Sequence, residues 1–203
     1  SPVLTLQNTP AEKYAQVMES GKDARTLRPT LYDFLLQRAI DIQADDTYYQ
    51  TWLQFRKTQV NPKAETLVAL DYLQYQYRKG EKTRSMYKQS LDSLLTHTTD
   101  PESQLEIQLN RLDWLQQEPY YYQNNAQQDS VRQIVYDFCQ QQAQAFAAYP
   151  RANEFKNAIE RMEQASISIQ HKNQVYPGKE QELKIRYKHV TELRVKVYQN
   201  KAA

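Results

Sequence analysis

The chain's single cysteine, Cys139, precedes Gln142 by three positions, and a Cys and a Gln at this spacing can form an internal thioester. Such a site normally has a Glu beside the Gln, whereas Gln141 occupies that position here. Cys139 also follows Phe138 in a stretch of helical character, where a small thiol is ordinarily buried. We therefore expect a packed thiol, and one cysteine permits no internal disulfide.

Carboxylates and histidines are the other residues that could carry chemistry. The neighbouring acidic pairs are Asp45 with Asp46, Glu102 with Glu106, and Asp33 with Asp41. General acid–base catalysis needs a pocket that shifts pKa values, and no set of residues assembles a nucleophile, a base and an oxyanion donor. The three histidines are His97, His171 and His189. They are too far apart in the sequence to show the spacing of metal ligands. The sequence predicts a protein without catalytic activity, cofactor or metal.

The densest aromatic cluster is Tyr120, Tyr121 and Tyr122, which follows Glu118 and Pro119. Such a cluster can form a platform that binds a sugar or a peptide. It can equally form a loop whose rings pack between helices with their hydroxyl groups outward. Both interpretations stay open at the level of the sequence.

The composition limits the fold that must position these residues. The chain has 203 residues, 40% hydrophobic residues, 16 Tyr and only 3 Gly. Scarce glycine excludes phosphate-binding loops and dinucleotide-binding turns, which need glycine at strained backbone positions. A net charge of +2 argues against a nucleic-acid partner. Because no apolar run approaches the length of a membrane helix, we expect no membrane insertion.

Apolar residues recur at spacings of three and four over most of the chain, which is typical of amphipathic helices. Helices are expected to open at Pro10, Pro29, Pro62 and Pro101, because each proline follows or lies beside a capping residue. Three further helices are expected, each from a stripe of apolar or aromatic residues: Tyr48 to Phe55, Met86 to Leu95, and Val131 to Phe146. A last helix carries Ala152 to Met162. We predict a mainly α fold, an array of αα-hairpins similar to a tetratricopeptide-like solenoid, as a helical domain over residues 1–164.

After Gln164 the pattern changes to strict alternation of apolar and polar residues, which predicts half-buried strands. The three expected strands are centred on Ile167 and Ile169, on Leu183 to Tyr187, and on Leu193 to Val197. Pro177 and Gly178 predict a turn between the first two strands, and 189–191 predicts a hairpin between the last two. We expect residues 165–203 to be the first, truncated part of a β domain.

The segment from Arg28 to Arg38 is expected to be structural. Pro29 is placed in the first helical turn, and Leu31, Phe34 and Leu35 are predicted to share a buried face. Tyr32 is expected at the border of that face with its hydroxyl toward a polar partner. Asp33 suits the positive end of the helix dipole, and Arg38 is expected to anchor a neighbouring element.

The same segment, Arg28-Pro29-Thr30-Leu31-Tyr32-Asp33-Phe34-Leu35 followed by Arg38-Ala39, resembles the large alpha-2-macroglobulin-like proteins of Bacteroidetes. A second stretch agrees in order: Tyr149-Pro150, then Ala165-Ser166-Ile167-Ser168-Ile169-Gln170, then Pro177, then Arg186-Tyr187-Lys188. The sequence departs from the family where Ala165 replaces a proline and His189 replaces an asparagine.

The resemblance implies a helical region that precedes macroglobulin-like β domains in a long protein of the periplasm or cell envelope. Members of the family are thought to trap or inhibit proteases through regions far outside this chain, so none of those residues is assigned here. The leading hypothesis is a non-catalytic scaffold whose partners are other domains of the parent chain and, through it, proteases. The alternative is a helical binding module that captures a peptide or a glycan. A concave groove lined by Tyr and Trp would favour the alternative.

Overall fold

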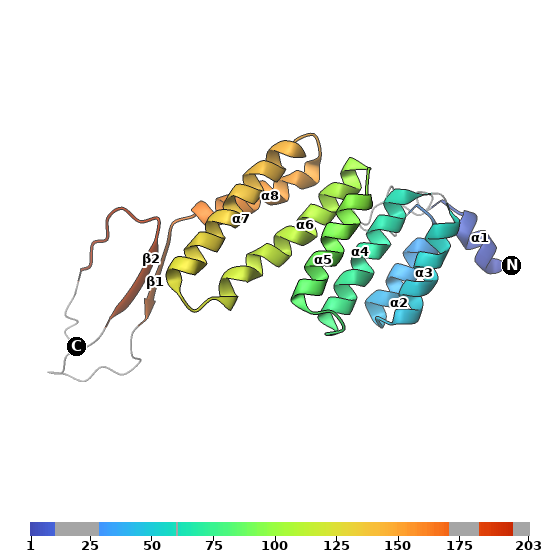
Figure 1. Cartoon of the computed structure of the whole chain (residues 1–203), viewed down its shortest axis with the longest axis horizontal. Helices are drawn as coiled ribbons and strands as arrows, with labels where there is room; N and C mark the ends of the chain where they lie inside the picture. The colour runs from blue at the N-terminus through green and yellow to red at the C-terminus, as the bar shows by residue number, and fades with distance from the viewer. Residues whose placement is uncertain (11–28, 60, 171–182, 197–203) are drawn as a thin grey trace, which may run out of the picture.

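The structure, a computed structural model, describes residues 1–10, 29–59, 61–170 and 183–196. This part of the chain is mainly helical and ends in a short antiparallel sheet of two strands. Most of the helices lie side by side in a row, with the N-terminus at one end and the sheet at the other (Figure 1). Of the helix predicted from Pro10 to Gly21 the structure describes Pro10 alone, and the turn predicted at Pro177-Gly178 lies outside the described residues.

Eight α-helices are present in the described residues. Their bounds are α1 Pro2–Asn8, α2 Leu31–Ile42, α3 Asp46–Thr58, α4 Pro62–Arg78, α5 Arg84–His97, α6 Pro101–Gln117, α7 Asn125–Ala145 and α8 Asn153–Glu163. Two short 3-10 helices, η2 (Glu118–Tyr121) and η3 (Pro150–Ala152), lie between α6 and α7 and between α7 and α8. From α2 to α8, each helix packs against the next, and α6 also contacts α4 and α8.

Polar caps define where several helices begin, as their sequence signals predicted. The side chain of Asn61 accepts a hydrogen bond from the backbone N–H of Ala64, and Asp100 accepts one from Ser103, each just ahead of a proline at the first turn. α4 ends at Arg78, and Gly80 then adopts a left-handed backbone with φ of +84°. A glycine tolerates this conformation without strain, so the chain can turn there toward α5.

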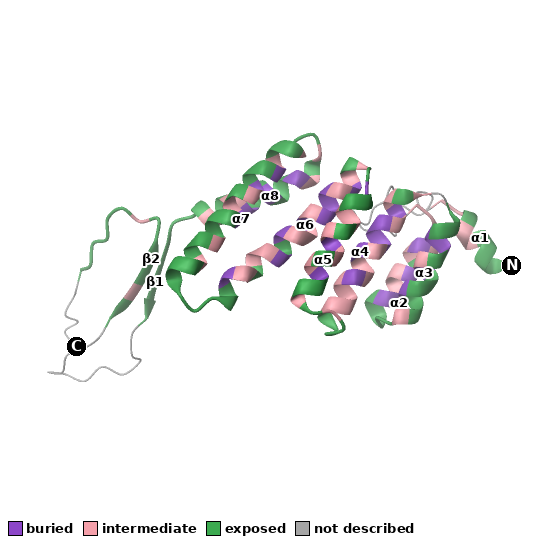
Figure 2. Cartoon of the chain, in the orientation of Figure 1, coloured by how far each residue is buried: buried purple, intermediate pink, exposed green. Residues whose placement is uncertain are grey.

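Three apolar clusters stabilise the row of helices, and Figure 2 shows buried residues on the sides where helices face one another. The first lies between α2, α3 and α4 around Trp52, the second between α4, α5 and α6 around Leu91, and the third between α6, α7 and α8 around Phe155. The aromatic stripe predicted for α3 is a core face, because Tyr49, Trp52 and Phe55 are all buried.

The buried face of α2 differs from the predicted one. Leu31 and Phe34 are half-buried and Leu35 is 43% exposed, whereas the buried residues are Asp33, Leu36 and Ile40. The predicted face was wrong because a charged residue, Asp33, points into the core. The helix therefore turns Leu36 and Ile40 toward α3 and leaves Leu35 toward solvent.

Pro29 was also misplaced by the prediction. The helix begins at Leu31 with Thr30 as its N-cap, so Pro29 precedes the cap and is not in the first turn. Its fixed φ still favours the extended backbone from which the chain enters the cap.

Two of the three predicted strands are present. Strand β1 (Ser166–Gln170) pairs with strand β2 (Lys184–Lys188) in antiparallel register, with Ile167 opposite Tyr187. The third predicted strand was wrong over its described part, because residues 191–196 form no strand. His189 directly follows β2 and has a positive φ of 51°. Its Nε2 atom lies 3.1 Å from the carbonyl oxygen of Met162. No strand follows β2 within residues 189–196, so the predicted hairpin is absent from the described part of the chain. No helix among the described residues is long and apolar enough to span a membrane.

Candidate functional site

Three neighbouring cavities, of about 450, 280 and 220 Å³, share lining residues along the row of helices. Gln74 lines all three cavities, and Arg78 lines two of them. Asn110, Asp113 and Gln116 are shared by the central cavity and the one toward α8. We call this surface the groove. Its lining comes mainly from α2, α4, α6 and α8.

The helical repeat explains why these side chains share one face. Gln74 and Arg78 are four residues apart on α4, while Asn110, Asp113 and Gln116 follow one another at intervals of three on α6. Residues at these spacings lie on the same side of a helix. The neighbouring apolar residues of both helices are buried and fix which side faces outward: Leu70, Leu73, Leu109 and Leu112.

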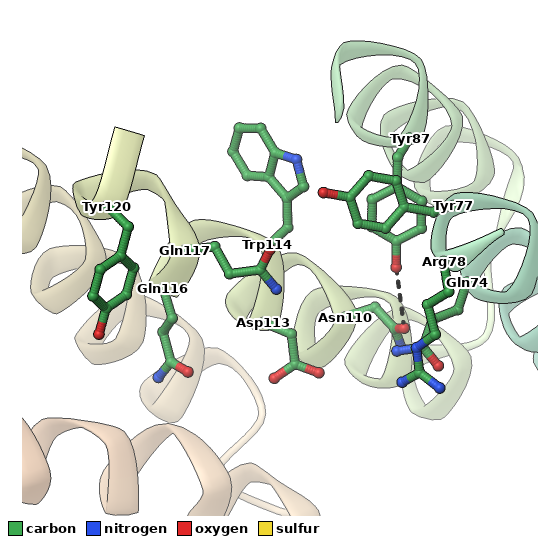
Figure 3. A pocket seen from close by; sticks show the side chains of 10 residues that line it. All are labelled: Gln74, Tyr77, Arg78, Tyr87, Asn110, Asp113, Trp114, Gln116, Gln117 and Tyr120. Carbon is green, nitrogen blue, oxygen red and sulfur yellow. Dashed lines mark hydrogen bonds between the residues drawn. The ribbon is translucent and has the colours of Figure 1, made fainter. Parts of the chain in front are cut away.

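Aromatic side chains form one wall of the central cavity (Figure 3). Tyr77 of α4 and Tyr87 of α5 stack with ring centroids 4.6 Å apart and planes 17° from parallel. The Tyr87 hydroxyl donates a long hydrogen bond of 3.5 Å to Oδ1 of Asn110. Burial raises the pKa of Tyr87 to about 12, with a further contribution from the charge of Asp113. Tyr87 therefore remains a neutral donor at physiological pH.

Trp114 is the second aromatic element of the central cavity, and a protein cation already covers its ring. The guanidinium of Arg84 lies 4.2 Å from the ring centroid of Trp114 and donates a 2.7 Å hydrogen bond to its carbonyl oxygen. The indole N–H of Trp114 in turn donates to the carbonyl oxygen of Arg84 at 3.3 Å. These contacts tie α5 to α6 and hold the indole rigidly at the cavity wall.

A buried carboxylate marks the end of the groove nearest α8. Glu106 is only 2% exposed, and the guanidinium of Arg151 binds both of its oxygens, with Nη2 at 3.1 Å from Oε2. Glu154 and Arg161 complete this end. The ion pair joins α6 to the segment that leads into α8, so it fixes the distance between the walls here.

The tyrosines singled out in the sequence lie on and just after η2, at the edge of the groove. Tyr120 is 86% exposed and lines the central cavity. Tyr121 is also exposed, and the Arg84 guanidinium lies 4.6 Å from its ring centroid. Tyr122 accepts a hydrogen bond on its carbonyl oxygen from Gln128. Only Tyr120 of the three belongs to the groove.

The residues predicted to be structural surround a buried charge cluster between α2 and α3. Asp33 is fully buried, and it accepts hydrogen bonds from the Trp52 indole at 2.7 Å and from Arg56 at 2.5 Å. The backbone N–H and the hydroxyl of Thr30 donate to the same carboxylate at 2.9 and 2.6 Å. Asp33 therefore caps α2 and also anchors α3, which is more than a helix-start role.

The other predicted structural residues lie around that cluster. Tyr32 packs edge-on against Phe55 with centroids 4.8 Å apart. Arg38 pairs with Asp41 on its own helix at 3.2 Å, and its guanidinium lies 5.4 Å from the ring centroid of Phe34. Arg38 and Phe34 are thus partners at the surface of α2, and neither lines the groove.

Cys139 is fully buried among α6, α7 and α8 residues, as expected for a packed thiol. Burial raises the pKa of this thiol to about 11, which keeps it protonated and unreactive near neutral pH. Within the described part of the chain, no group of three or more His, Cys, Asp or Glu side chains could hold a metal ion.

The groove was missed at the level of the sequence, although a signal for it exists. The polar residues of α4 and α6 repeat at spacings of three and four beside the apolar stripes, but such residues usually form a solvated helix face. Which helices face each other depends on long-range packing.

No protein family, curated protein or solved structure matches this chain.

Proposed function

We propose that the chain is a non-catalytic binding module that holds an extended peptide in the groove. The observation that carries the proposal is the sharing of Gln74, Arg78, Asn110, Asp113 and Gln116 among adjoining cavities. Shared walls make one elongated surface, and an elongated ligand fits such a surface better than a compact one.

The amide side chains favour a peptide backbone as the ligand. Gln74, Asn110 and Gln116 each offer a carbonyl acceptor and an NH₂ donor, which are the complements of a backbone N–H and C=O. An extended backbone presents these groups at regular intervals whatever its sequence. Arg78 and Asp113 add one charge of each sign to the central cavity, which favours a peptide with charged or polar side chains.

A glycan fits the groove less well, because sugars need the open faces of aromatic rings. Tyr77 and Tyr87 stack on each other, and Arg84 covers a face of Trp114. Among the rings of the central cavity, Tyr120 alone is strongly exposed.

The proposal includes a repeat architecture of successive αα-hairpins, similar to a tetratricopeptide-like solenoid. Pairing α2 with α3, α4 with α5, and α6 with α7 would place the first helix of every pair at the groove. The lining by α2, α4, α6 and α8 supports this pairing, because solenoids form their binding surfaces from equivalent helices of successive repeats.

A second candidate function is a structural scaffold within a large envelope protein of the alpha-2-macroglobulin type. The segment that carries the resemblance builds the buried Asp33 cluster, which ties α2 to α3. In that setting other domains of the parent chain, and proteases through them, are the partners, and the location is the periplasm or envelope. A scaffold needs no ligand in the groove, so one experiment separates the two functions.

The experiment is selection of random linear peptides displayed on phage against the whole folded chain. The binding module should enrich peptides whose affinity falls about tenfold or more in a Gln74→Ala and Asn110→Ala double variant. Gln54→Ala, at an exposed amide on α3, is the matched control and should leave binding unchanged. Selection of no peptide, equal binding by the double variant, or binding on a glycan array alone would contradict the proposal and leave the scaffold role.

A further inference from the structure

The two-stranded sheet has two faces of opposite chemistry. The register places Ile167 opposite Tyr187 and Ile169 opposite Ile185, so these four side chains form one apolar face. The other face carries the cations of β2, with Lys184 opposite Gln170, Arg186 opposite Ser168 and Lys188 opposite Ser166.

The apolar face is open in the described structure. Ile167, Ile169 and Tyr187 are 49%, 56% and 64% exposed, and Figure 2 shows the strands as almost entirely exposed. An isolated two-stranded sheet is marginally stable in water, and stable sheets add strands or a covering layer. Within the residues that the structure describes, β1 and β2 pair only with each other, so each strand has an unpaired edge.

Within the described residues, no opposite charge on the sheet faces the cations of β2. Opposite charges on paired strands stabilise a sheet, whereas the partners of Lys184, Arg186 and Lys188 on β1 are all neutral. No acidic side chain among the described residues forms an ion pair with any of these three cations. Among the described residues, Lys188 donates to the carbonyl oxygen of Arg161, at 3.5 Å.

We infer that the free edge of β2 binds an extended strand whose side chains alternate between apolar and acidic. In such a strand the apolar residues would extend the Ile and Tyr face, and the acidic residues would lie across from Lys184, Arg186 and Lys188. The charge selects β2 over β1, because a strand added beside β1 would have Ser and Gln as its cross-strand neighbours. Main-chain hydrogen bonds would supply the remaining affinity, as in other cases of strand addition.

The end of β2 that carries these cations is approachable. Arg186, Tyr187 and Lys188 line a cleft of about 1200 Å³ whose other wall is α7 and the end of α8. Arg132 of α7 lies on that wall and pairs with Asp129 at 2.7 Å, and Glu163 also lines the cleft. The cleft makes the end of β2 accessible, while the preference for acidic residues comes from the cations of β2 itself.

Two capped synthetic peptides of about seven residues test the inference, one alternating glutamate with valine and the other lysine with valine. Titration into the whole chain should show the acidic peptide binding at least about tenfold more tightly, with affinity that falls as salt rises. Hydrogen exchange should slow at the backbone amides of residues 184–188 in the complex, which simple charge attraction would not produce.

Charge reversal supplies the control. The double variant Arg186→Glu, Lys188→Glu should reverse the preference toward the lysine peptide. The variant Lys57→Glu, Lys156→Glu has the same net charge at exposed helix positions and should retain the original preference. Equal binding of both peptides, a preference that the first variant does not change, or protection only in the helices would overturn the inference.

Discussion

The Asp33 carboxylate and the Arg56 guanidinium form an ion pair in the core of the helical region, with Oδ2 and Nη2 2.5 Å apart and both side chains 1% exposed. Asp33 lies at the start of α2 and Arg56 near the end of α3, so the pair closes one end of this helix pair. Thr30 and Trp52 satisfy the remaining acceptor positions of the carboxylate. A charge this deeply buried depends on its partner, since water cannot replace it.

Replacing Asp33 should therefore cost much more than the loss of a helix cap. Asp33→Asn leaves Arg56 buried without a counter-charge, and we expect the free energy of unfolding to fall by about 3–5 kcal/mol. A role at the helix start alone would cost about 0.5–2 kcal/mol. Urea denaturation decides between these values, with Asp41→Asn as the control, because Asp41 pairs with Arg38 at the surface and should cost at most about 1 kcal/mol. Equal losses of unfolding free energy in the two variants would show that the buried pair contributes no more to stability than the surface pair.

Two phenylalanines test the position of the core. Phe155 is fully buried between α6, α7 and α8, so Phe155→Ala should cost about 3–5 kcal/mol. Phe34 is half-buried on α2 beneath Arg38, and Phe34→Ala should cost only about 1–2 kcal/mol. Thermal unfolding of both variants measures the difference. A midpoint that falls further for Phe34→Ala than for Phe155→Ala would mean that α2 packs by its predicted face after all.

The buried thiol makes a prediction about pH. Burial raises the pKa of Cys139 from 9.0 to about 11. Between these two pH values the thiol stays protonated in the folded protein but loses its proton in the unfolded chain. The stabilisation from burying the neutral thiol is present below about pH 9 and is lost as the pH rises toward 11. At pH 8 a thiol reagent should react with the folded chain at least about tenfold more slowly than with the chain in denaturant. Cys139→Ala should flatten the loss of stability above pH 9 relative to the parent chain. Rapid reaction of the folded protein at pH 8 would contradict the burial.

Local signals predicted much of the helical framework. The starts of α4 and α6 were predicted from a capping residue followed by a proline, namely Asn61-Pro62 and Asp100-Pro101. Both signals lie within one helical turn, so they can be recognised in the sequence. Alternation also predicted β1 and β2, whose side chains do share faces as expected. These features depend on neighbours in the sequence and so can be inferred from it.

Long-range relationships explain what the sequence analysis missed. Asp33 occupies a core position because Arg56 and Trp52, which are distant from it in the sequence, both donate hydrogen bonds to its carboxylate. Apolar spacing alone places Leu35 in the core instead, although Leu35 is exposed. Likewise, Gln74 and Asn110 line one groove because α4 packs against α6 across α5, which no local pattern encodes. The third predicted strand alternates like the first two, yet residues 191–196 form no strand, because a strand also needs a pairing partner that a local pattern does not supply.

Hydrogen exchange of the whole chain, with and without a peptide obtained by selection, tests the groove most directly. We expect slower exchange in α4 and α6 around Gln74, Arg78 and Asn110 when the peptide is bound, with α3 unchanged at Gln54. The Gln74→Ala and Asn110→Ala double variant should lose that protection while unfolding at nearly the same urea concentration as the parent chain. Protection confined to α3, to the outer side of α5 or to the sheet would contradict a peptide-binding groove on α2, α4, α6 and α8.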